Sequence, residues 1–84
     1  MSLRFTVERT WDVKGRTGLL VRGRVSGGPL RPGMKLGEQG ATRTVRIDGI
    51  ELIDRPGTVT VVVDRSARWL REGVVLTEAA SMAS

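Results

Sequence analysis

Glycine-containing turns interrupt this sequence about every eight to twelve residues, and short runs of alternating apolar and polar residues lie between them. Side chains on a β-strand point alternately to two faces, so this period of two is typical of half-buried strands. The pattern predicts an all-β domain that packs as a small barrel or sandwich. Closure into a barrel would also remove the exposed strand edges that promote aggregation.

The alternation predicts six strands. They cover residues 3–8, 19–25, 34–36, 41–53, 58–64 and 74–77. In the second strand Leu20, Arg22 and Arg24 are expected to face outward, and Gly23 marks a bend or a close backbone approach. In the fourth strand one extra residue near Asp48 would restore the alternation, which predicts a β-bulge.

The sequence also predicts two turns and the bounds of the domain. Pro32 and Gly33 favour a type II turn, because proline presets φ at the first central position and glycine tolerates positive φ at the next. Residues 66–72 are predicted to form a single helical turn that ends at Gly73. We expect one domain over residues 3–78 and a flexible tail over 79–84.

The composition contains neither cysteine nor histidine. The common general bases, thiol nucleophiles and metal ligands are therefore missing, and we expect neither an enzyme nor a bound metal or cofactor. Asp48, Glu51 and Asp54 lie close in sequence, but the arginines around them indicate a solvated, salt-bridged sheet face. No stretch is long and apolar enough to suggest a membrane span or a signal peptide, so a cytoplasmic location is expected.

The basic residues are concentrated in one segment. The net charge is +5, and between residues 13 and 37 there are several basic side chains and no acidic one. A concentrated basic patch is the footprint of phosphate binding, which makes structured RNA a candidate partner. The candidate RNA-binding residues are Lys14, Arg16, Arg22, Arg24 and Arg31. The alternative is a solvated strand face whose arginines pair with acids elsewhere, such as Glu8 or Glu51.

Trp11 and Trp69 are two of the three aromatic residues. Exposed tryptophans beside basic residues can stack on the bases of single-stranded nucleic acid. In a small barrel a tryptophan more often closes an open end as a hydrophobic lid, and we favour this interpretation for both. Trp11 is expected in the loop after the first strand, and Trp69 in the helical turn.

A second hypothesis is a protein-interaction module. Leu20 and Val62 are apolar residues at outward positions of the predicted strands, where a solvated sheet would carry polar side chains. Together with Trp69 they would form an exposed apolar patch that fits a protein partner. A fold hosts many functions, so the predicted barrel does not choose between the two hypotheses.

The order of short motifs resembles the second domain of translational GTPases such as elongation factor Tu, here as a stand-alone domain. The motifs that carry the resemblance lie at residues 5–8, 14–25, 28–36, 45–52 and 70–76. The resemblance implies a six-stranded closed Greek-key β-barrel and contacts with ribosomal RNA or with tRNA.

The chain also departs from that family. Met34 replaces the usual aspartate after Gly33, and the segment between Leu52 and Val59 is much shorter than in the GTPases. No Gly-x-x-x-x-Gly-Lys-Ser/Thr loop is present, so no nucleotide binding of its own is expected.

Overall fold

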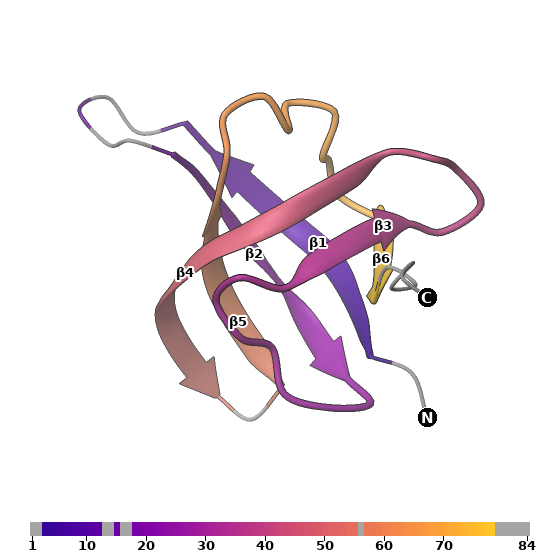
Figure 1. Ribbon diagram of the computed structural model, residues 1–84. Helices are drawn as coiled ribbons and strands as arrows, with labels where there is room; N and C mark the ends of the chain where they lie inside the picture. Colours follow the sequence, from indigo (N-terminus) through magenta and orange to yellow (C-terminus); the bar gives the residue numbers. More distant parts are fainter. Residues whose placement is uncertain (1–2, 13–14, 16–17, 56, 79–84) are drawn as a thin grey trace.

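The structure, a computed structural model, describes residues 3–12, 15, 18–55 and 57–78. These residues form six strands and no helix (Figure 1). The strands are β1 (Arg4–Trp11), β2 (Leu19–Ser26), β3 (Lys35–Glu38), β4 (Thr44–Arg55), β5 (Thr58–Val63) and β6 (Val75–Glu78). The described part of the chain therefore holds no helix able to cross a membrane.

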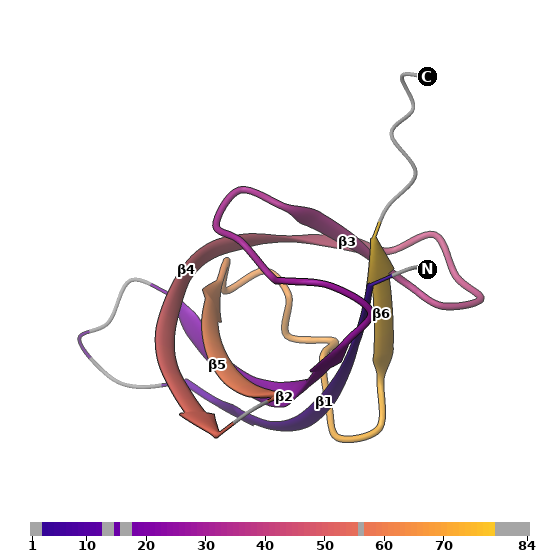
Figure 2. The ribbon, with the colours of Figure 1, turned by 90° about the horizontal axis from the view of Figure 1, so that it is seen from below.

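The six strands close into a barrel in the order β1-β2-β5-β4-β3-β6, and every neighbouring pair is antiparallel. Figure 2 looks along the barrel and shows the ring of strands. Three consecutive strands, β3, β4 and β5, are direct neighbours, and the following strand β6 returns to lie beside β3, which is a Greek-key arrangement. The predicted all-β, six-stranded closed barrel is confirmed.

Alternating side chains from all six strands or their ends fill the interior. Phe5 and Val7 from β1 and Val21 from β2 are buried, as the period of two predicts. The same holds for Val61 and Val63 of β5. With no disulfide in the chain, the barrel depends on this apolar core and on its ring of backbone hydrogen bonds.

The chain between β5 and β6 crosses one end of the barrel (Figure 1). The predicted helical turn over residues 66–72 is wrong. Three successive turns replace it, closed by the Ala67–Asp64, Leu70–Ala67 and Val74–Arg71 backbone hydrogen bonds. Their spacing of three residues points both Ala67 and Leu70 into the core, where each is 3% exposed. This end of the barrel is therefore sealed by turns rather than by a helix.

The first of these turns is held by the side chain of Asp64. The backbone N–H of Ser66 donates to Asp64 Oδ1 at 2.7 Å. The backbone and side-chain hydrogen bonds from Ser66 lower the pKa of Asp64 below its ordinary value of 3.8. Bonds made to the ionised carboxylate stabilise the turn above the ordinary pKa, and this stabilisation is lost as the pH falls through the lowered pKa.

We therefore expect Asp64 to titrate below 3.8 when its carboxyl ¹³C shift is followed by NMR. Ser66→Ala removes the side-chain bond and keeps the backbone bond, so it should move the pKa part of the way back. An Asp64 that titrates at its ordinary value in the native chain would contradict this account of the turn.

The strand register shifts at one place in β1 and at three places in β4, and two of these irregularities bear on the site. In β4 the register shifts between Ile47 and Gly49, which confirms the bulge predicted at Asp48. In β1 the register shifts between Val7 and Arg9, and this bulge was not predicted. Glu8 is the extra residue, and side chains beyond a bulge exchange faces. Arg9 and Trp11 consequently point outward, although the unbroken alternation of Phe5 and Val7 would have turned them inward.

The remaining turns and strand ends differ only slightly from expectation. The Arg31–Met34 turn has its backbone hydrogen bond at 3.2 Å and a φ of +92° at Gly33, as the Pro-Gly pair predicts. β3 begins one residue later than predicted, at Lys35, and β4 begins at Thr44 rather than Ala41.

Candidate nucleic-acid interface

The outward side chains of β1 and β2 gather three of the five candidate site residues that the structure describes on one surface, which we name the arginine face. It comprises Arg4, Thr6, Glu8, Arg9, Trp11, Leu20, Arg22 and Arg24. Four arginines and one glutamate give this face a net charge of +3. Because the strands alternate, the same segments that bury Phe5 and Val21 present the arginines to solvent.

The register of β1 against β2 places one pair of like charges opposite each other. Arg9 lies directly opposite Arg22, and Thr6 lies opposite Arg24. Like charges opposite each other on one face of a sheet destabilise it, so this arrangement is not one that folding alone would favour. A surface rich in one sign of charge attracts ligands of the opposite sign.

Glu8 lies between the two arginines of β2. Its Oε1 is 3.7 Å from Nε of Arg22, and its Oε2 is 3.7 Å from Nε of Arg24. The pairing with Glu8 that the solvated-face alternative predicts is therefore present. A single carboxylate shared by two guanidinium groups leaves the pair with an excess positive charge, however, so the face stays cationic.

Trp11 belongs to the arginine face. It is the last residue of β1, not part of the following loop, and it lies opposite Leu20. The guanidinium of Arg9 lies over its ring, 4.9 Å from the centroid. The lid interpretation is thus wrong for Trp11, because the bulge at Glu8 turns this side chain outward.

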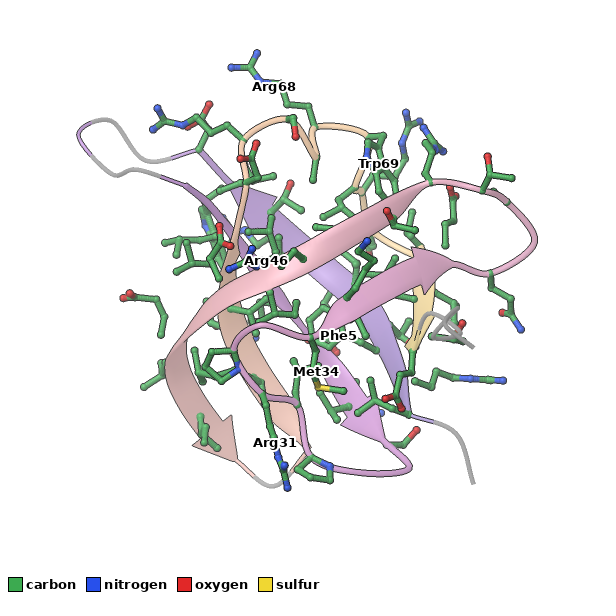
Figure 3. The ribbon with its side chains drawn as sticks, in the orientation of Figure 1. Phe5, Arg31, Met34, Arg46, Arg68 and Trp69 are labelled. Carbon is green, nitrogen blue, oxygen red and sulfur yellow. The ribbon has the colours of Figure 1, made fainter. Side chains whose placement is uncertain are left out.

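Trp69 occupies a different place. It is partly buried against the core in the turns between β5 and β6, and Arg43 lies 4.5 Å from its ring centroid. This agrees with the lid interpretation. Figure 3 shows Trp69 and Arg68 at one end of the barrel and Arg31 at the other. Arg31 and Trp69 therefore do not form one site with each other.

Two predicted site residues, Lys14 and Arg16, lie outside the described residues, as does the predicted tail over 79–84. Of the other candidates, Trp11, Arg22 and Arg24 are brought together, and Arg31 lies in the exposed turn between β2 and β3. Sequence reasoning missed Arg9, which only the register of β1 places beside Arg22.

Elsewhere several charged side chains form ion pairs. Arg46 lies 3.8 Å from Asp48 on β4, which fits the predicted salt-bridged sheet face. Arg43 pairs with Glu38 at 2.8 Å, and Asp12 lies 3.0 Å from Arg65. Among the residues described, no group of three or more acidic side chains is placed to hold a metal ion.

No family model matches the chain, and no curated protein is significantly similar to it.

Proposed function

We propose that this barrel is a non-catalytic RNA-binding module, related in architecture to the second domain of translational GTPases and acting in the cytoplasm. Its target is structured RNA such as ribosomal RNA or tRNA. The observation that carries the proposal is the arginine face, on which Arg9 and Arg22 stand opposite each other and Trp11 lies at the edge. Arginine suits this role because its planar guanidinium binds phosphate in a bidentate manner and also stacks on flat rings.

The geometry supports contact with a phosphate backbone. Arg24 has a side chain that is 74% exposed, so it can reach a ligand without rearrangement of the barrel. Arg22 is less exposed, at 34%, and is held in place by the sheet and by Glu8. Arg22, which is held in place, can fix the position of one phosphate of the RNA. Arg24, which is exposed, can adapt to the neighbouring phosphates.

An NMR titration of labelled protein with tRNA and with ribosomal RNA fragments tests the proposal. We expect shifts on Arg9, Trp11, Arg22 and Arg24 that weaken as salt rises, because bound phosphates release their counterions. The logarithm of the affinity should fall with the logarithm of the salt concentration with a slope of about −2 to −4 for three to five phosphate contacts. Absence of shifts at low salt would overturn the proposal.

A second candidate function is protein binding, and one observation favours it. Leu52 and Ile53 of β4 are 57% and 68% exposed, and they are the exposed large hydrophobic residues of the part of the chain that the structure describes. Ile53 borders an apolar hollow of about 400 Å³ with Val25 and Leu30. In the apolar patch that the sequence predicts, Leu20 and Val62 lie opposite one another, but Trp69 packs on the core instead.

The simplest partner at Leu52 and Ile53 is a second copy of the chain, which sedimentation equilibrium detects. This candidate predicts a dimer that the Leu52→Ser, Ile53→Ser variant dissociates. A protein that stays monomeric at high concentration counts against it.

A further inference from the structure

A hollow of about 420 Å³ opens beside the arginine face, where β1, β2 and β5 meet. Its polar lining consists of Thr6, Glu8, Arg22, Arg24, Ser26 and Thr58. The volume falls within the range of about 300 to 1,000 Å³ that is common for small-ligand sites. It is therefore large enough to receive one unit of a polymer rather than only a bare ion.

The lining combines donors and an acceptor. Guanidinium groups only donate hydrogen bonds, whereas an ionised carboxylate only accepts them. Arg22 and Arg24 suit an anionic oxygen, but Glu8 between them repels a bare anion. The ligand that satisfies all three side chains carries a negative group and a hydroxyl donor side by side.

The fold fixes Glu8 in this position. Glu8 is the extra residue of the β1 bulge, and bulges often redirect a side chain toward a functional site. On the other edge of β1, the N–H of Val7 donates to the carbonyl of Val74 at 2.8 Å, and that of Gly73 donates to the carbonyl of Val7 at 2.9 Å. Backbone bonds thus anchor the residue directly before Glu8, and its carboxylate does not depend on a loop.

From this geometry we infer that the hollow binds one ribonucleotide unit of the RNA, with the phosphate on Arg22 and Arg24 and the 2′-hydroxyl donating to Glu8. In a ribonucleotide the 2′-hydroxyl is adjacent to the 3′-phosphate, which is the juxtaposition that the lining requires. Only the 2′-hydroxyl distinguishes RNA from DNA at a single sugar. Glu8 then makes the module selective for RNA, in exchange for some loss of total attraction to phosphates. This inference rests on the proposed RNA-binding function.

The test compares two synthetic hairpins with the sequence of a tRNA arm, one with natural ribose and one with 2′-fluoro sugars, which remove the donor. We expect the native protein to bind the natural hairpin about tenfold more tightly, the effect of one hydrogen bond to a charged acceptor. Glu8→Ala should bring the two affinities together, and it should bind the fluorinated hairpin more tightly than the native protein does. Glu8→Gln keeps an acceptor without the charge and should retain part of the preference.

Glu38→Ala is the matched control, because it also removes a glutamate that pairs with an arginine, but on β3. It should leave the preference unchanged. Equal binding of the two hairpins by the native protein, or a preference that survives in Glu8→Ala, overturns the role of Glu8 while leaving the RNA-binding module intact. Failure of the native protein to bind either hairpin overturns both the inference and the proposed function.

Discussion

Replacement of Gly23 by alanine is expected to destabilise the barrel by about 3 kcal/mol or more, the upper part of the range for overpacked cores. A Cβ at this position would lie 2.5 Å from the carbonyl oxygen of Thr6 and 2.7 Å from the ring of Phe5. The Thr6 oxygen belongs to the backbone of β1, so no change of side-chain rotamer relieves the clash. Thermal unfolding followed by circular dichroism should show a midpoint lower by on the order of 15 °C.

Gly49→Ala provides the matched control. Gly49 also lies within a strand, but a Cβ there meets no atom within 4 Å. Its replacement should leave the midpoint nearly unchanged or raise it slightly, because alanine restricts the unfolded chain. Similar losses in both variants would show that strand glycines in general, rather than the contact between β1 and β2, determine the stability.

Reversal of charge at Arg22 and Arg24 is expected to weaken RNA binding by at least about 100-fold, since each arginine provides a charge-assisted contact worth about tenfold or more. The Arg22→Glu, Arg24→Glu variant should also show a salt dependence that is shallower by about 1.5 in the logarithmic slope. Fluorescence anisotropy with a labelled tRNA at several salt concentrations measures both quantities.

Two further variants make this result specific. Arg46→Glu is the control, because the Arg46 side chain is 70% exposed, close to the 74% of Arg24, and stands on β4, opposite β1 in the ring. It should cost much less affinity than Arg24→Glu alone. Arg24→Glu also serves if the double variant fails to fold, since Arg24 is the more exposed of the two arginines. Equal losses at Arg24 and Arg46 would mean that total charge, rather than the arginine face, drives binding.

Much of the fold could be predicted because the apolar alternation is strong where the core is. The alternation at Val61 and Val63 directly indicates which face of β5 is buried, and the broken alternation around Asp48 correctly indicates a bulge. The sequence predicts a helical turn after β5, but the Ser66 N–H donates to the Asp64 side chain, and such local hydrogen bonds compete with helix formation. The apolar spacing of three, at Ala67 and Leu70, resembles that of a helix.

The candidate site was less accessible from sequence. Arg22 and Arg24 could be placed on one face because they are two residues apart in one strand. The position of Arg9 and Trp11 depends on the bulge at Glu8, and no apolar residue follows Val7 closely enough to reveal it. A single inserted residue reverses the direction of every later side chain in the strand. Sequence reasoning therefore identified two of the four arginines of the arginine face, Arg22 and Arg24. It placed Trp11 in the loop after the first strand instead of on this face.

The closure of the barrel also determines by which route two molecules can form a non-native dimer. β6 has only four residues, and it joins the ring through three aligned pairs to β1 and three to β3. Detachment of this strand would uncover two unpaired edges at once, each able to accept a strand from another molecule. Since the strand that fits this gap best is β6 of an identical chain, reciprocal exchange of β6 is the simplest route to a domain-swapped dimer.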